Sequence, residues 1–286
     1  MIGSHGWNSG AGWLPIQNET SWVDSFQGFF DGQNHFIANL FINGGNNIGF
    51  FGRIYSSQIS NIGLLNVDIR GVGTVGSLAG YADSVSNSYA IGSVIASGDS
   101  AGGLLGGSFG TINNSRFIGS VESTNSNVGG LVGYTFGQII NSYSIGFVNS
   151  SNSNVGGLIG SAMNNVINSY SISSVEGSSN VGGLIGSVMG GTISSSYSTG
   201  FVSSTGSNVG GLIGIAWGSV TNSYWNNETS GQTTSDAGSP LTTAQMKQQA
   251  IFNTWNFGSI WAIKEGQSYP YLRALPTPSP LPGTQD

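Results

Sequence analysis

The stretch Val128-Gly-Gly-Leu-Val-Gly133, with Ile139-Ile-Asn-Ser-Tyr-Ser-Ile-Gly146 shortly after it, decides the fold because both blocks return along the chain. The second block recurs with a spacing of 27 residues, and the glycine-leucine block before each copy recurs every 26 to 28 residues. The copies of the Asn-Ser-Tyr motif begin at Asn87, Asn114, Asn141, Asn168, Ser195 and Asn222. Repetition at a fixed period of this size is the sequence signature of a stacked repeat protein.

The composition of the repeat favours short strands over helices. Its apolar positions are mostly Val and Ile, and Ser and Gly fill much of the rest. Within one copy, Ile139, Tyr143 and Ile145 share one parity along an extended chain, whereas Val148 has the other. A bend near Gly146 would turn both sets toward a common core. We therefore expect Tyr143 and Ile145 to face inward.

Equal spacing places the same residue type at the same point of every turn. Stacked turns pair each strand with its copies at about 4.8 Å, which gives parallel, in-register sheets. The prediction is an all-β fold, a parallel β-helix (β-solenoid) of about seven turns with ~27-residue repeats and a length on the order of 35 Å. Apolar columns are expected at Val94, Val121, Val148, Val175 and Val202, and at Leu78, Leu104, Leu131, Leu158, Leu184 and Leu212.

Two further columns are the candidate functional features of the repeat. The amide column contains Asn87, Asn114, Asn141, Asn168 and Asn222. It is interpreted either as a structural ladder of amides that hydrogen-bond to one another or as a polar row that binds a ligand. The aromatic column contains Tyr89, Tyr143, Tyr170, Tyr197 and Tyr224. These rings either pack within the structure or form a contact surface for sugars, and Arg116 occupies the second position of the column.

The two ends of the chain differ from the repeats. All seven tryptophans lie there, at Trp7, Trp13, Trp22, Trp217, Trp225, Trp255 and Trp261. A solenoid exposes its core and its strand edges at both ends, so we interpret these aromatic residues as caps. Thr242-Thr-Ala-Gln245 matches a capping box and predicts one short helix from about Thr243 to Phe252.

The expected organisation has four parts. Residues 1–42 form an N-terminal cap with the opening strands, 43–227 the repeats, 228–275 a C-terminal cap with the short helix, and 276–286 a proline-rich linker or tail. The prolines from Pro276 to Pro282 are typical of a stiff, extended linker.

Scarce charge restricts the chemistry that this chain can perform. Charged residues make up 6 % of 286 residues, the net charge is −6, and cysteine is absent. Six basic residues disfavour nucleic acid as a partner. Between Glu122 and Glu228, Glu176 is the only acidic or basic side chain, so the repeats contain no carboxylate pair for glycoside hydrolysis and no calcium cluster. We expect no enzymatic activity, no cofactor, no metal and no transmembrane segment.

The repeated blocks resemble the GLUG repeat of large bacterial surface proteins, among them filamentous-haemagglutinin-like adhesins and immunoglobulin-A-protease-like proteins. The segment Phe29-Phe-Asp-Gly-Gln-Asn-His-Phe-Ile-Ala-Asn-Leu40 is similar to one that opens such arrays. The segment from Leu241 through Trp261 to Leu272 is similar to one that closes them. The resemblance implies a secreted or outer-surface protein of the adhesin kind and supplies no catalytic residues. With no signal peptide recognisable, we expect a fragment of a larger secreted protein.

Several functions remain open at this point. The first is a non-enzymatic extracellular module that acts as a stalk or as a weak, multivalent binding surface for glycans or other cell surfaces. The second is a purely structural spacer or filament subunit whose strand edges associate end to end. Ice binding and activity on polysaccharides are less favoured, because the chain lacks regular Thr-x-Thr columns and catalytic side chains.

Overall fold

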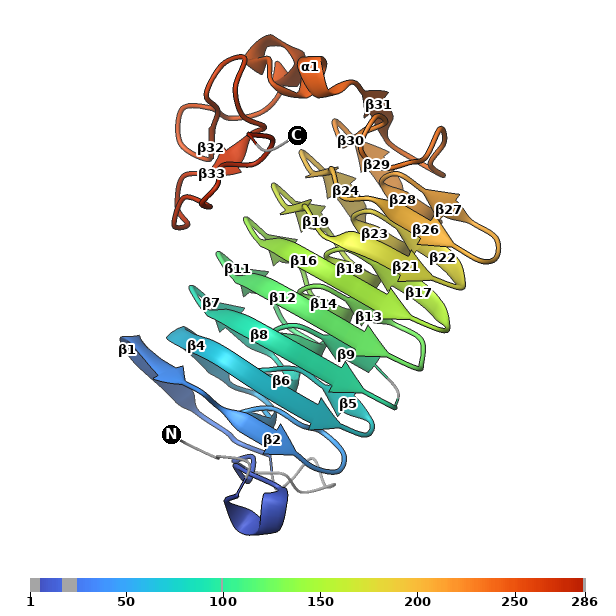
Figure 1. Ribbon diagram of the computed structural model, residues 1–286. Helices are drawn as coiled ribbons and strands as arrows, with labels where there is room; N and C mark the ends of the chain where they lie inside the picture. The colour runs from blue at the N-terminus through green and yellow to red at the C-terminus, as the bar shows by residue number, and fades with distance from the viewer. Residues whose placement is uncertain (1–5, 17–24, 99, 285–286) are drawn as a thin grey trace.

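The computed structural model describes residues 6–16, 25–98 and 100–284, and these residues form the predicted parallel β-solenoid (Figure 1). Within these ranges the turns contribute strands to three sheets of six, seven and eighteen strands. Strands of successive turns pair in parallel and in register, so that Val148 lies opposite both Val121 and Val175. The prediction of an all-β solenoid of about seven turns is confirmed.

Two of the sheets receive one strand from each turn. The six-stranded sheet contains β5 (Thr74–Val75), β9 (Ser100–Gly102), β13 (Val128–Gly129), β17 (Ser153–Gly156), β22 (Ser179–Gly182) and β27 (Val209–Gly210). The seven-stranded sheet contains β3 (Phe51–Arg53), β6 (Ala79–Ala82), β10 (Leu105–Ser108), β14 (Val132–Thr135), β18 (Ile159–Ala162), β23 (Ile185–Val188) and β28 (Ile213–Ala216).

The eighteen-stranded sheet, called the wide sheet below, receives two rows of strands. It begins with β1 (Phe29–Ala38), β2 (Phe41–Asn43) and β4 (Gln58–Gly71). The first row then contains β7 (Ser84–Ser86), β11 (Ile112–Asn113), β15 (Ile139–Ile140), β19 (Val166–Ile167), β24 (Thr192–Ser194) and β29 (Ser219–Thr221). The second row contains β8 (Tyr89–Ala96), β12 (Arg116–Ser123), β16 (Tyr143–Ser150), β20 (Tyr170–Ser171), β21 (Ser174–Gly177), β25 (Tyr197–Ser198), β26 (Val202–Ser204), β30 (Tyr224–Asn226) and β31 (Ser239–Leu241).

The core between the three sheets consists of stacked apolar columns. The leucine column and the valine column expected from the repeat are both buried, with Leu131 fully inaccessible and Val148 only 1 % exposed. Because each side chain packs on its copies in the turns above and below, the columns join into one continuous cluster from Leu40 to Trp225. Burial of this apolar surface is the main favourable contribution to the stability of the stack.

The side chains after the asparagine of each repeat point in a different direction from the one expected, because the chain turns a corner there. Asn141 has a positive φ of 49°, and this conformation turns the chain between the two rows of the wide sheet. As a result Tyr143 and Ile145 point away from the core, and they pack in a separate cluster outside it. The expectation that both face inward is therefore wrong, because strand parity does not continue through a left-handed residue.

After β31 the chain leaves the stack, and the C-terminal segment (residues 242–284) runs back along the outer face of the wide sheet, where Figure 1 shows it in dark orange and red. It contains α1 (Thr243–Met246), the 3₁₀ turn Gln249–Phe252, and an antiparallel pair of short strands, β32 (Trp261–Ala262) and β33 (Tyr271–Leu272). The capping box at Thr242 and Gln245 is present. The helix is shorter than expected, because extended backbone at Gln248 separates α1 from the 3₁₀ turn.

The tryptophans divide between the ends and the side of the solenoid. Trp225 is buried in the last turn of the core, and the ring of Trp13 stacks on Phe50 in the first turn. Trp255 and Trp261 instead pack against the tyrosines of the wide sheet, so they cover its side rather than its end. Trp7 and Trp217 are exposed, and Trp22 lies outside the described residues.

The proline-rich tail does not extend away from the body as a linker would. Pro278 and Pro282 are buried, and the carbonyl oxygen of Pro282 accepts a hydrogen bond from the backbone N–H of Tyr269. The tail therefore lies against the rest of the C-terminal segment and the wide sheet.

Candidate functional site

The described residues offer few groups for catalysis or metal binding. Across residues 6–16, 25–98 and 100–284, no three or more His, Cys, Asp or Glu side chains gather into a metal-binding group. In the same part of the chain, no helix has the length and apolarity needed to span a bilayer.

The predicted amide column lies at the corner of the wide sheet and is linked by side-chain hydrogen bonds. The Nδ2 group of Asn114 donates to Oδ1 of Asn87 at 3.2 Å, and Asn168 donates to Asn141 at the same distance. Asn141 itself donates to Asn113, at 3.5 Å, rather than to Asn114. All five asparagines and Ser195 have φ between 47° and 50°. Asparagine suits this corner because it tolerates the left-handed conformation better than most residues.

A second amide column, which the sequence reasoning missed, lies at the start of the strands of the six-stranded sheet. Asn127, Asn154, Asn180 and Asn208 have φ between 51° and 60°. From Asn154 onward each amide donates to the one in the preceding turn, at 3.0 Å for Asn154 to Asn127 and 2.8 Å for Asn180 to Asn154 and for Asn208 to Asn180. The signal was present in the sequence, since each of these asparagines stands directly before a Val-Gly-Gly-Leu block.

The predicted aromatic column is largely closed to ligands. Tyr143, Tyr170 and Tyr197 are at most 1 % exposed, and their rings stack at 4.8 and 5.0 Å beneath the C-terminal segment. Burial raises the pKa of Tyr143 to about 12 and holds the pKa values of Tyr170 and Tyr197 well above the usual value. A sugar cannot reach these three rings in this arrangement, so they serve packing.

The two ends of the aromatic column are more open. Tyr89 and Tyr224 are half-buried. The guanidinium of Arg116 lies 4.2 Å from the centre of the Tyr89 ring, a cation–π arrangement that accounts for a charged residue in this column.

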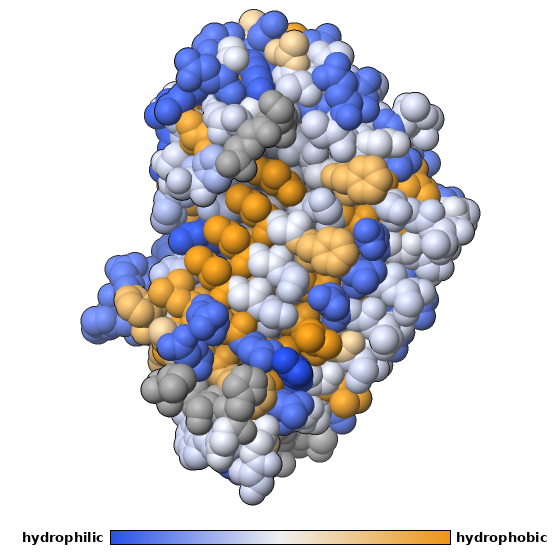
Figure 2. Space-filling view, viewed as in Figure 1, coloured by the Kyte–Doolittle hydropathy of each residue, from blue (hydrophilic) through white to orange (hydrophobic). Residues whose placement is uncertain are grey.

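The outer face of the wide sheet carries an apolar band beside the C-terminal segment, visible as orange atoms in Figure 2. Ile118, Ile145 and Ile172 belong to it, and together with Pro278 and Leu281 of the tail they line a hollow of about 270 Å³. The three isoleucines are partly buried against the cluster that the C-terminal segment forms with the wide sheet, so this part of the band serves packing within the chain.

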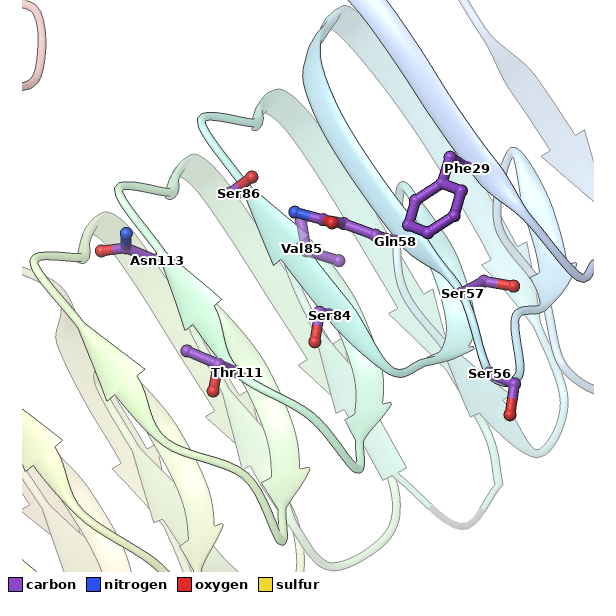
Figure 3. Close-up of a pocket in the computed structure, with 9 residues that line it drawn as sticks. All are labelled: Phe29, Ser56, Ser57, Gln58, Ser84, Val85, Ser86, Thr111 and Asn113. Carbon is purple, nitrogen blue, oxygen red and sulfur yellow. The ribbon is translucent and has the colours of Figure 1, made fainter.

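A polar hollow of about 450 Å³ lies where the seven-stranded sheet gives way to the wide sheet, in the first turns of the solenoid (Figure 3). Its polar side chains come from three consecutive turns and are all uncharged: Ser56, Ser57, Gln58, Ser84, Ser86, Thr111 and Asn113. Phe29 of β1 lies at its rim with 87 % of its surface exposed. The sequence reasoning did not single out these residues, because only the stacking of turns brings them together.

An acidic residue on the same strand as Phe29 is held in its charged form. The carboxylate of Asp31 accepts hydrogen bonds from Nδ2 of Asn61 and from the backbone N–H of Gln33, both at 2.9 Å. These bonds lower the pKa of Asp31 below its ordinary value. A carboxyl group with a lowered pKa is poorly suited to act as a general acid at neutral pH.

Comparison with known proteins supports the fold and leaves the family open. No family model matches the chain. Over 77 residues the chain is 38 % identical to halomucin from Haloquadratum walsbyi, and this match covers 26 % of the chain and 1 % of halomucin. A solved structure of a candidate immunoglobulin A1 protease from Bacteroides ovatus has a TM-score of 0.59 at 20 % identity, covering 92 % of this chain and 82 % of that one. At this identity the likeness concerns the fold alone.

Proposed function

We propose that this chain is a non-enzymatic, extracellular β-solenoid module of a GLUG-repeat surface adhesin, which acts as a stalk and as a weak, multivalent binding surface for glycans. The names of the two similar proteins, a halomucin and a candidate immunoglobulin A1 protease, fit a surface or secreted protein. The stacked turns give a stiff, elongated body of the kind that a stalk requires.

The observation that carries the glycan proposal is the uncharged hollow beside Phe29. A sugar has an apolar C–H face and a set of hydroxyl groups. An exposed aromatic ring complements the first, and serine, threonine and amide side chains complement the second. Because each contact of this kind is weak, useful affinity would come from several copies of the module on one surface.

Binding of neutral glycans to the intact chain tests this proposal. We expect a panel of neutral surface glycans to bind with low affinity and the Phe29→Ala variant to bind more weakly. Phe36→Ala is the matched control, since Phe36 is also exposed, lies on the same strand and does not line the hollow. Failure of every glycan to bind an intact, monodisperse sample would exclude the adhesive role.

A structural spacer is the second candidate, and the C-terminal edge of the solenoid favours a spacer over a filament. The Asp236 carboxylate accepts a hydrogen bond from the backbone N–H of Ala216 at 2.7 Å, and Ser235 Oγ accepts one from Ile213 at 2.9 Å. These side chains occupy donors that end-to-end strand pairing would need. Concentration-dependent fibres in electron micrographs would instead support a filament subunit.

A further inference from the structure

An exposed apolar ridge runs parallel to the solenoid axis on the corner that follows the seven-stranded sheet. The corner residue that follows this sheet, aligned by strand register, is aromatic or apolar in six of seven turns, and these side chains are 38 to 63 % exposed: Tyr55, Phe109, Phe136, Met163, Met189 and Trp217. Asp83 takes the same position in the remaining turn. Phe109 stacks on Tyr81 with the ring centres 6.0 Å apart, and Phe136 lies edge-on to Tyr134 at 5.8 Å, yet more than a third of each ridge side chain stays exposed.

The backbone holds the ridge residues in line. The N–H of Phe136 donates to the carbonyl of Ser108 at 2.9 Å, that of Met163 to Thr135 at 3.0 Å, and that of Trp217 to Val188 at 2.8 Å. Equivalent residues therefore follow one another at about 4.8 Å per turn. The rings of Phe109 and Phe136 lie nearly parallel with their centres 5.5 Å apart.

A row of hydroxyl and amide side chains runs beside the ridge. It begins at Gln58, which pairs with Ser84, and continues through Thr111, Gln138, Asn165, Thr192 and Ser219. Backbone bonds from Val85 to Thr111, from Ile112 to Gln138 and from Ile139 to Asn165 keep the row in register. Figure 3 shows its first three members, Gln58, Ser84 and Thr111, in neighbouring turns.

The side chains of this row are available to a ligand. Those of Thr111, Gln138 and Thr192 are partly exposed and make no hydrogen bond to another described residue. Across the ridge and the row together, Asp83 is the only charged side chain. The two columns thus form a neutral strip that presents apolar contacts on one side and hydrogen-bonding groups on the other.

Periodicity selects the kind of ligand that such a strip fits. The same pair of chemical groups recurs at a constant spacing along a straight line, so a polymer of identical units can repeat one contact at each step, whereas the surface of a globular protein without repeats lacks this regularity. The scarcity of charge removes the electrostatic steering typical of protein partners and of anionic polymers. Each added unit supplies a further weak contact.

We propose that this strip binds a linear, uncharged polysaccharide that lies along the solenoid axis, from the hollow beside Phe29 toward Trp217. The proposal rests on the glycan-binding function above and adds the ligand's class, direction and length. Six steps of about 4.8 Å separate Tyr55 from Trp217, so the strip is roughly 29 Å long. Affinity should rise with chain length and level off once the polymer spans that distance.

Calorimetric titration with neutral glucan and mannan chains of increasing length tests the proposal. For chains long enough to span the strip, we expect the double variant Phe136→Ser, Met163→Ser to bind about tenfold more weakly, which is about 1.4 kcal/mol. The same variant should bind short oligosaccharides as the unaltered chain does, because the hollow beside Phe29 is intact. Phe201→Ser, which removes an exposed ring from the link between β25 and β26, is the control.

The other possible results distinguish failure of the strip proposal from failure of the glycan-binding function. If the affinity for neutral glycans does not depend on their length and is the same for the ridge variant, the strip is not the binding site. The broader glycan-binding function would then still hold. Tighter binding of an anionic chain such as polygalacturonate, or of a protein that competes at the ridge, would overturn the ligand class. If no neutral glycan of any length binds, both proposals fail. Thermal unfolding of each variant verifies that the double substitution leaves the fold intact.

Discussion

The backbone N–H of Ser115 donates to the hydroxyl oxygen of Ser142, the equivalent residue one turn later, at 3.2 Å. The Ser142 hydroxyl in turn donates to the carbonyl of Ile140 at 2.8 Å. The same pair of bonds recurs at Ser88, Ser115, Ser142, Ser169 and Ser196. These serines are fully buried. Each hydroxyl satisfies a backbone donor at the corner, where the ladder of the sheet is interrupted.

Removing one of these hydroxyls should destabilise the solenoid. Ser142→Ala leaves the buried N–H of Ser115 without its acceptor, and we expect the free energy of unfolding to fall by about 1–3 kcal/mol. Urea denaturation followed by circular dichroism measures the change. Ser207→Ala, at an exposed serine, is the control. Equal stability of the two variants would show that water replaces the lost acceptor.

The second amide column combines an unusual backbone conformation with a hydrogen-bonded side chain, and two substitutions separate these effects. Asn154→Gly removes the amide bonds to Asn127 and from Asn180 but still permits φ of 58°. Asn154→Ala removes the bonds and also strains the backbone. We expect the alanine variant to be less stable than the glycine variant by about 1 kcal/mol in denaturant titrations. If both variants lose the same amount of stability, the amide hydrogen bonds alone, and not the backbone conformation, explain why asparagine occupies this position.

Trp261 anchors the C-terminal segment to the wide sheet. It is fully buried, and its ring centre lies 6.1 Å from those of both Tyr170 and Tyr197. Trp261→Ala should cost about 3–5 kcal/mol and loosen the segment. Limited trypsin digestion reports this directly, because Lys264 and Arg273 lie in the segment and are exposed.

The matched control for this experiment is Trp217→Ala, which truncates an exposed tryptophan outside the cluster in which Trp261 packs. Faster cleavage at Lys264 and Arg273 is expected for Trp261→Ala alone. Cleavage of both variants at the same rate as the unaltered chain would contradict the anchoring role.

Alkaline pH should weaken the packing of the C-terminal segment on the wide sheet, because Tyr143 is buried between them. Burial raises the pKa of Tyr143 to about 12, whereas an unfolded tyrosine ionises near pH ~10. Between these values the unfolded state binds fewer protons than the folded state, so stability is complete below pH ~10 and falls as the pH rises toward 12. The slope is about 1.4 kcal/mol per pH unit for each such tyrosine.

Urea midpoints measured at about pH 9 and about pH 11 give this slope. Tyr143→Phe removes one titrating phenol and should reduce it. A slope that does not change in this variant would mean that Tyr143 is not among the groups responsible.

Much of the fold could be predicted from particular residues of the repeat. The 27-residue spacing of the motif that begins at Asn141 predicts the stacked turns, and the columns of Leu131 and Val148 predict the core. These predictions succeed because in-register stacking is a local rule repeated many times. The direction of Tyr143 could not be predicted in the same way, since a single positive φ at Asn141 reverses the alternation.

The candidate site depended still more on the tertiary structure. Phe29, Gln58, Ser84 and Thr111 belong to four segments, and each is unremarkable in its own stretch of sequence. Their proximity arises from the pairing of β1, β4, β7 and β11 in consecutive turns. No single repeat contains the pattern, so only the stack could reveal it.

The sequence by itself determined a charge-poor β-solenoid, because a fixed period places like residues about 4.8 Å apart and like charges at that distance repel. The tertiary structure decided which columns remain exposed. The C-terminal segment covers the tyrosines, for example through the hydrogen bond from Tyr197 Oη to the carbonyl of Pro270 at 2.6 Å, between residues 73 positions apart. Contacts at such separations depend on how the two surfaces fit, and no local pattern in either segment encodes that fit.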